Sequence, residues 1–276
     1  MVKINYISDL HLEFYGDDVN FEKVMNFDND AEIICLAGDI GYPEHPNYEK
    51  FLSFISGKFK YVFLITGNHE YYHLNNNIDI KTIEKSHLLI NKICSNFINV
   101  FFLDNRMLFL EEYNLYVIGS TLWSFFDIQK INTKMLKYIY NTNDFKNIFY
   151  ENNNIIKKFN IDKRNDMFFN SLNFIDESLN FIKNNNNSDN YPKVLVLTHH
   201  LPSYKLMELP YRYNINNFIY ATNLDYLFHK YEINAWICGH AHTHYDTIIN
   251  NCYLGINAYG YPEKNKIAIF NKYFFL

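Results

Sequence analysis

Five short apolar runs in this chain are each followed within two residues by a residue that can bind a metal ion. Runs of this length, bounded by Gly or Asn turn signals, are typical of buried strands. The runs and their continuations are Val2 to Ile7 with Asp9-Leu10-His11, Ile33 to Ala37 with Gly38-Asp39, Tyr61 to Thr66 with Gly67-Asn68-His69-Glu70, Val194 to Thr198 with His199-His200, and Ala235 to Cys238 with Gly239-His240-Ala241-His242. A chain with this pattern is constrained to a sheet whose strand ends meet at one polar site.

The spacing of the remaining segments predicts helices between these strands. Strands are expected over 2–8, 32–37, 61–66, 99–103, 115–120, 193–198, 234–238, 245–249, 252–257 and 266–270. Helices are expected over 20–27, 47–57, 78–96 and 222–231. Alternation of this kind predicts an α/β layered fold with ligands at the carboxyl ends of the strands. The last four strands are expected to form a meander.

Residues 121–192 interrupt this alternation. Helical patterns dominate there, especially over 165–183, and we expect no recurring strand. We interpret 121–192 as an inserted helical cap within a single domain covering 1–276. The basic pairs Lys157-Lys158 and Lys163-Arg164 are expected on a solvated helix face.

Composition bears on whether the protein binds nucleic acid or a membrane, and on the cellular compartment in which it works. The net charge of −5 supplies no general electrostatic footprint for a nucleic-acid backbone. No apolar run approaches the roughly 20 residues that cross a bilayer, and the N-terminus lacks the features of a signal peptide. None of the four cysteines has C-x-x-C spacing, so we expect reduced thiols, a reducing compartment and a cytoplasmic location.

The donor types at the strand ends predict a metal centre. Carboxylate, carboxamide and imidazole donors are supplied by Asp9, Asp39, Asn68, His11, His199, His240 and His242. Mixed oxygen and nitrogen donors suit Mn²⁺, Fe, Zn²⁺, Co²⁺ or Ni²⁺ better than Ca²⁺. So many donors suit two ions that share a bridging carboxylate. Two ions about 3.5–4 Å apart clamp the attacking and leaving oxygens of an in-line phosphoryl displacement and lower the pKa of a bound water.

The spacing of donor residues within two of these strand-end segments supports a common metal centre. Asp9 and His11 are two residues apart, and so are His240 and His242; in extended backbone such pairs project to the same side. His69, beside a candidate ligand, would point differently and stay unligated. It is then free to protonate a leaving oxygen or to stabilise charge on the phosphoryl group.

The blocks D-x-H, GD, GNHE, THH and GHxH, in this order, resemble the calcineurin-like metallophosphoesterase superfamily. The resemblance runs from residue 2 to about 261 and is closest to small cytosolic-type members with SDLHLEF, LAGDIG, GNHEYY and THH-x-PS. It implies a four-layer α/β/β/α sandwich. It also implies one metal held by Asp9, His11, Asp39 and His242, and a second held by Asp39, Asn68, His199 and His240. Asp39 would bridge, and His69 would be the general acid or charge stabiliser.

Two departures from the superfamily pattern bear on the activity. Its protein serine/threonine phosphatases carry an Asp and an Arg shortly after GD, where this chain has Tyr42 and Pro43. A protein-phosphatase role is therefore disfavoured. Similar small members end in N-P-R-G-Y, and Tyr259 stands here in place of that Arg.

The sequence thus predicts a dinuclear metal-dependent phosphoesterase that hydrolyses a monoester or a diester by a metal-bridged hydroxide. His69 and Asp39 are the catalytic candidates, and the substrate is expected to be a small phosphorylated molecule, with nucleotides among the options. His200 either supports a ligand or faces substrate, Arg212 is a candidate phosphate contact, and Glu70 is expected to steady its loop. The alternative is a non-catalytic metal-binding or protein-interaction module on the same scaffold. A nuclease is disfavoured by the low basic charge.

Overall fold

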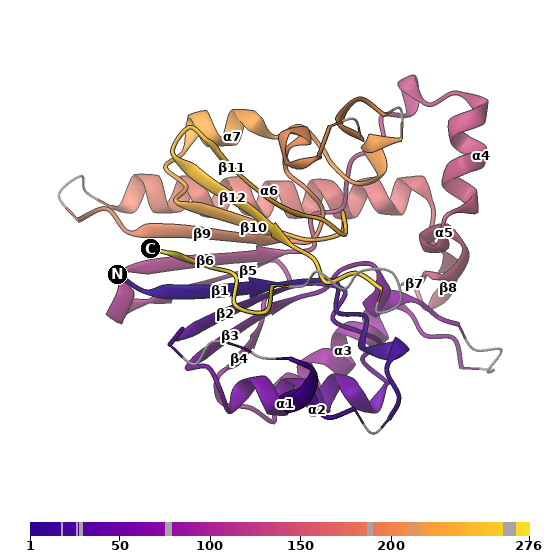
Figure 1. Ribbon diagram of the computed structural model, residues 1–276. Coiled ribbons are helices and arrows are strands. Elements are labelled where there is room, and N and C mark those ends of the chain that lie inside the picture. Colours follow the sequence, from indigo (N-terminus) through magenta and orange to yellow (C-terminus); the bar gives the residue numbers. More distant parts are fainter. Residues whose placement is uncertain are drawn as a thin grey trace.

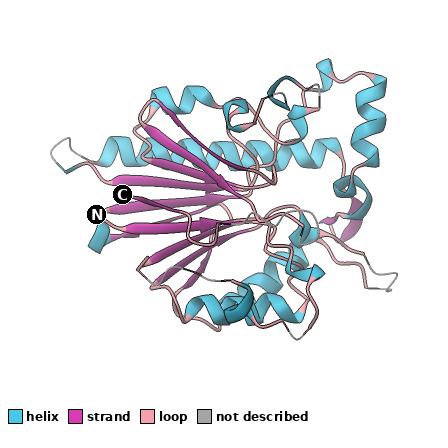
Figure 2. Cartoon of the chain, in the orientation of Figure 1, coloured by secondary structure: helices cyan, strands magenta, loops and turns pink. Residues whose placement is uncertain are grey.

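The computed structural model describes residues 1–17, 19–25, 27, 30–74, 79–186, 190–209, 211–214, 216–261 and 269–276. Two β-sheets lie face to face, and helices cover the outer face of each sheet (Figures 1 and 2). The described N- and C-terminal residues lie side by side, since the last strand pairs with the first.

The first sheet holds the strands of the N-terminal third of the chain. Its order is β13 (Tyr273–Phe275), β1 (Lys3–Ile7), β2 (Ile33–Ala37), β3 (Tyr61–Ile65) and β4 (Val100–Phe102). Strands β1 to β4 are parallel, and β13 joins the edge antiparallel to β1. Their carboxyl ends therefore share one edge.

The second sheet holds the later strands. Its order is β11 (His244–Ile249), β12 (Cys252–Asn257), β10 (Ala235–Cys238), β9 (Lys193–Thr198), β6 (Leu115–Ser120) and β5 (Arg106–Leu110). The four inner strands are parallel, and β11 and β5 are antiparallel edges.

Helices complete the outer layers. The first sheet is covered by α1 (Phe21–Val24), α2 (Pro46–Ser56) and α3 (Ile83–Cys94), and the second by α6 (Ile161–Asn185) and α7 (Asp225–Lys230). Beyond the strand ends stand α4 (Thr133–Asn141), α5 (Asn143–Asn147) and the hairpin β7 (Phe149–Asn152) to β8 (Ile155–Lys158). Short 3-10 turns lie at Leu12–Phe14, His69–Tyr71, Glu111–Tyr113, Ile128–Lys130, Tyr204–Leu206, Tyr211–Tyr213 and Asn217–Ile219.

Apolar side chains fill three layers, one between the sheets and one under each set of helices. The layer between the sheets includes Tyr6, Phe63, Leu195 and Ile237. The sheets approach closely at Gly119, where a Cβ would lie 2.3 Å from the Cβ of Leu103. The predicted four-layer α/β/β/α sandwich is confirmed.

Several element predictions differ from the structure. Strand β5 was not predicted, although its residues 107–110 are apolar; it is an edge strand in which only Leu110 is buried. Helix α3 begins at Ile83 because the Thr82 side chain accepts from the Lys85 N–H and caps the helix there. The predicted start at 78 lies outside the described residues. Of the helix predicted over 20–27, the described residues form only the short helix α1.

The predicted C-terminal meander is wrong. The well-buried strand β12 lies beside β10 in parallel, and β11, whose residues are mostly half-exposed or exposed, takes the sheet edge. Of the predicted strand 266–270, residues 266–268 lie outside the described part, Ile269 is in no regular element and Phe270 is in a turn. The last described strand is β13.

The segment 121–192, here called the cap, contains the expected helices α4, α5 and α6. The expectation of no strand there is wrong, because β7 and β8 pair antiparallel. Ile175, Leu179 and Ile182 of α6 pack in the same cluster as Val194 and Val196 of β9, so α6 also forms the outer layer of the second sheet.

The four cysteines are free and buried. Among the described helices, none has both the length and the apolar character needed to pass through a bilayer.

Candidate metal centre

The strand ends converge as the sequence predicted. Three groups of side chains offer ligand atoms that lie within 4.8 Å of one another: Asp9 with His11 and His242, His11 with Asp39 and His69, and Asp39 with His199 and His240. Asp39 belongs to two of these groups. Donors from both sheets therefore form one continuous cluster.

Five of these donor residues have left-handed rather than extended backbone conformations, and this directs their side chains toward the cluster. The residues Asp9, His11, Asp39, His240 and His242 have φ between 48° and 67°. Positive φ is uncommon for residues other than Gly and costs about 1–3 kcal/mol where it is strained, so it concentrates at functional sites. The expected extended i, i+2 geometry is wrong for both pairs, although the pairs do reach a common centre.

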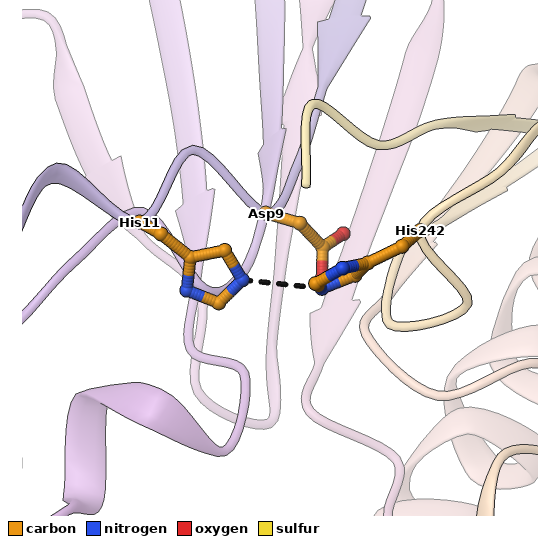
Figure 3. Close-up of side chains that lie close together, drawn as sticks. All are labelled: Asp9, His11 and His242. Atoms are coloured by element: carbon orange, nitrogen blue, oxygen red, sulfur yellow. Dashed lines mark hydrogen bonds and ion pairs between the residues drawn. The ribbon is translucent and has the colours of Figure 1, made fainter. Parts of the chain in front are cut away.

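In the first group, two imidazoles face each other beside a carboxylate (Figure 3). His242 Nε2 lies 3.1 Å from His11 Nε2 and 3.3 Å from Asp9 Oδ1. His11 Nδ1 lies 3.2 Å from Glu13 Oε1, an acceptor, so Nδ1 carries the proton and Nε2 presents its lone pair. The backbone N–H of His240 donates to Asp9 Oδ2 at 3.0 Å and fixes that carboxylate.

In the second group, His199 is oriented in the same way. Its Nδ1–H donates to the Ala37 carbonyl at 2.8 Å. Its Nε2 lies 3.1 Å from Asn68 Oδ1 and 3.4 Å from Asp39 Oδ2. Within the described structure His240 Nε2 is buried without a hydrogen-bond partner.

These donors fit divalent metal ions. Nitrogen lone pairs and acceptor oxygens point at one another, which is favourable only with a cation or a proton between them. Burial favours the neutral ring of His199, yet the Asp39 carboxylate outweighs burial and raises the pKa of His199 to about 10. Burial opposes ionisation of Asp39, but His199 holds its pKa well below the usual range. The two side chains thus each favour the charged form of the other.

His69 lies at the boundary of both groups. Its backbone N–H donates to Asp39 Oδ1 at 2.8 Å, and its Nδ1 lies 3.1 Å from Glu13 Oε1. Glu13 therefore joins His11 and His69 through one oxygen. Burial raises the pKa of the Glu13 carboxyl, but its bonds to the two imidazoles outweigh burial and lower that pKa to about 2.

Sequence reasoning missed Glu13, although it lies in the SDLHLEF block. Its only signal was an acidic residue directly after a turn of candidate ligands. Its side chain is 2% exposed, which a sequence pattern did not reveal.

Glu70 steadies the loop, as predicted. Its carboxylate accepts the backbone N–H groups of Asp39 at 3.1 Å, Ile40 at 2.8 Å and Gly67 at 2.8 Å. It thereby ties the loop after β3 to the loop after β2.

The surroundings of Arg164 and Arg212 differ from those that the sequence predicted. Arg164 is fully buried, so the prediction of a solvated helix face is wrong for this residue; Lys157 and Lys158 are exposed but lie on β8. Arg212 donates to the carbonyl oxygens of Met207 at 3.1 Å and Lys205 at 2.7 Å and is not among the described residues lining the hollow at the cluster.

His200 is buried behind the cluster rather than facing substrate. Its Nε2 lies 3.2 Å from Arg164 Nη2, and its ring centroid lies 4.2 Å from that of His240. Trp123 and Phe126, at the start of the cap, are buried core residues.

A hollow of about 320 Å³ opens over the donor cluster. The candidate donors that line it are Asp39, Asn68, His69, His240 and His242. Four tyrosines contribute to its walls, namely Tyr72, Tyr138, Tyr220 and Tyr261. The hollow is large enough for a small phosphoester.

A sandwich with this donor set at its strand ends belongs to the class of metal-dependent phosphoesterases. The family model described as calcineurin-like phosphoesterase matches residues 2–244, and the chain belongs to that family.

The uncharacterized protein L509 of Acanthamoeba polyphaga mimivirus is 31% identical over 288 residues, covering 99% of this chain and 95% of that protein. Two solved structures share the fold. The phosphopantetheinyl hydrolase of Mycobacterium tuberculosis has a TM-score of 0.64 at 15% identity, covering 95% of this chain and 90% of that one. The protein TT1561 of Thermus thermophilus has a TM-score of 0.56 at 9% identity, covering 93% of this chain and 89% of that one.

Proposed function

We propose that this protein is a dinuclear metal-dependent phosphoesterase. The observation that carries the proposal is the position of Asp39 in two donor groups, one next to His11 and one with His199 and His240. A carboxylate shared in this way suits two ions held close together.

The first ion would be held by Asp9, His11, Asp39 and His242, and the second by Asp39, Asn68, His199 and His240. When bound, such a pair lowers the pKa of water to near neutrality and neutralises charge on the phosphoryl oxygens. Mn²⁺, Fe, Zn²⁺, Co²⁺ and Ni²⁺ all suit the donor set.

The chain supplies orientation and proton transfer. His69 lines the hollow, and its Nδ1 is held by Glu13, so its Nε2, which lies 3.5 Å from the Tyr261 hydroxyl, is the atom that would face a leaving oxygen. We assign His69 as general acid or charge stabiliser. Glu13 would thus orient the His69 ring from the loop after β1.

The substrate would be a small phosphomonoester or phosphodiester. The hollow over the cluster adjoins a second one of about 420 Å³, and both are lined by Tyr138, Tyr220, Ala241 and His242. Among the described residues lining the two hollows there is no Lys or Arg. This composition favours a small ester over a nucleic-acid backbone. A cytoplasmic location stays a prediction.

Metal reloading tests the proposal. Chelated protein is reloaded with each of the five metals and assayed on a nitrophenyl monoester and a bis-nitrophenyl diester. We expect Asp39→Asn to lose bound metal because it removes the shared ligand, and His69→Ala to keep metal and lose turnover. His229→Ala, an exposed histidine of α7, is the control and should match wild type.

Equal activity in wild type, Asp39→Asn and His69→Ala would contradict the assigned roles. Metal binding with no turnover on either ester would favour the non-catalytic module instead.

A further inference from the structure

We propose that Arg164 of α6 and Asp144 of α5 are positioning residues that hold the second metal site from behind. On this view the cap completes one ion site and leaves the other unaffected. The inference rests on the proposed two-ion function and adds residues outside the recognised sequence blocks.

The Arg164 guanidinium is fully buried, and its N–H groups donate to fixed acceptors. It donates to the Ser124 carbonyl at 3.1 Å, to Ser124 Oγ at 2.7 Å and to the Ile219 carbonyl at 3.0 Å. Its Cζ lies 4.8 Å from the ring centroid of Trp123 and 4.3 Å from that of Phe126. A buried charge costs free energy unless it is paired and hydrogen-bonded. Moving the guanidinium would break these bonds, so it is held in one position.

One route runs from Arg164 to the carboxamide of Asn68. Arg164 Nη1 donates to Asp144 Oδ2 at 3.1 Å. Asp144 Oδ1 accepts from Asn68 Nδ2 at 2.9 Å and from the Tyr72 hydroxyl at 2.7 Å. The Tyr72 oxygen in turn lies 2.7 Å from Asn68 Nδ2.

This arrangement fixes which way the carboxamide points. Both acceptors lie on the amide nitrogen side, so Asn68 Oδ1 is directed to the opposite side, where it lies 3.1 Å from His199 Nε2. Without the acceptors, rotation of the carboxamide would place a donor where a metal ligand is needed.

The second route runs through His200 to His240. Arg164 Nη2 lies 3.2 Å from His200 Nε2, and the His200 ring packs against the His240 ring at 4.2 Å between centroids. The same guanidinium therefore supports two ligands of one site.

The first site is supported differently. Its carboxylate is bonded by Ser8 Oγ and the His240 backbone, and His11 is bonded by Glu13. These supporting groups all lie outside the cap. Loss of the Arg164–Asp144 pair should therefore weaken one site selectively.

Cobalt titration tests this asymmetry. The full-length chain, its Asp144→Asn and Arg164→Met variants and the control Arg106→Met are titrated with Co²⁺ by calorimetry and by the visible ligand-field spectrum. Arg106 is exposed on β5 and so controls for loss of an arginine. We expect wild type and the control to bind two ions. In both test variants one ion should keep its affinity and the other should bind about 10- to 100-fold more weakly.

Two further measurements separate positioning from packing. Tyr72→Phe removes one acceptor of Asn68 while keeping the ring, and should shift the same ion in the same direction even if Arg164→Met does not fold. Guanidinium added to Arg164→Ala should restore the second-site spectrum.

Unchanged affinity for both ions in Asp144→Asn and Tyr72→Phe would overturn the proposal. An equal loss of affinity for both ions in these variants would also overturn it. If wild type itself binds fewer than two ions, the proposed dinuclear function fails, and the inference fails with it.

Discussion

Gly67 shows how tightly single residues are constrained at this centre. A Cβ at this position would lie 2.2 Å from Asp39 Oδ1 and 2.6 Å from His199 Cε1. Neither neighbour can retreat, because Asp39 accepts the His69 N–H and His199 donates to the Ala37 carbonyl. A side chain at position 67 therefore displaces the shared carboxylate.

We predict that Gly67→Ala weakens metal binding at least tenfold and lowers the free energy of unfolding by about 1–3 kcal/mol, the usual cost of overpacking. Calorimetric metal titration and urea unfolding would measure both effects. Gly57→Ala is the matched control, because its Cβ would meet no atom closer than 3.6 Å. Wild-type metal affinity in Gly67→Ala would contradict this account.

At the residue scale, sequence patterns located the candidate donors and the supporting Glu70, but not the supports that lie in the cap. Asp9, Asn68 and His199 were predictable because each lies within two residues of the end of an apolar run. Asp144 and Arg164 were not, because they lie on cap helices and become neighbours of the site only through packing. A buried arginine carries no local sequence signal that separates it from an exposed one.

At the scale of elements, α6 serves two roles that its sequence does not separate. Ile175 faces the second sheet and is fully buried, whereas Phe181 on the same helix is 49% exposed. Arg164, near the amino end of α6, is buried behind the metal centre. One helix thus anchors both the outer layer and the cap.

We predict that Ile175→Ala lowers the free energy of unfolding by about 2–5 kcal/mol, because it leaves a cavity in the layer under α6. Phe181→Ala should change it by no more than about 0.5 kcal/mol, as expected for an exposed position. Equilibrium urea unfolding of the pair would measure the difference. Similar values for both variants would show that α6 does not pack on the sheet as described.

The fully buried strands were all predicted from the sequence, whereas the strands that were missed are only partly buried. β2, β3 and β9 are apolar and buried, so their runs were evident. β5 and the β7–β8 hairpin are exposed over much of their length; the four-residue strands of the hairpin have no comparable apolar run, whereas the apolar residues 107–110 of β5 were overlooked.

At the scale of the whole molecule, the donor cluster bridges the two sheets. Asp9 and Asp39 follow β1 and β2 of the first sheet, whereas His199 and His240 follow β9 and β10 of the second. Ions bound here would cross-link the sheets at their carboxyl edge. Metal binding is then coupled to the stability of the fold.

We predict that saturating Mn²⁺ raises the melting temperature relative to chelated protein. A ligand present at 1,000 times its Kd stabilises the native state by about 4.1 kcal/mol. Scanning calorimetry with and without chelator would measure the shift, and Asp39→Asn should show little of it. Identical melting of loaded and chelated wild type would argue against ions joining the sheets.

The four-layer arrangement was implied by the family resemblance, and the sequence by itself determined the well-buried strands and the candidate metal donors. These follow from local properties: apolar runs set buried strands, and donors directly after them must lie at one sheet edge. Only the tertiary structure decided the left-handed backbone conformation of several of those donors, the pairing of Glu13 with two imidazoles and the burial of Arg164 behind Asn68. Those features depend on contacts between segments far apart in the chain, whose geometry is set by how the sheets and the cap pack.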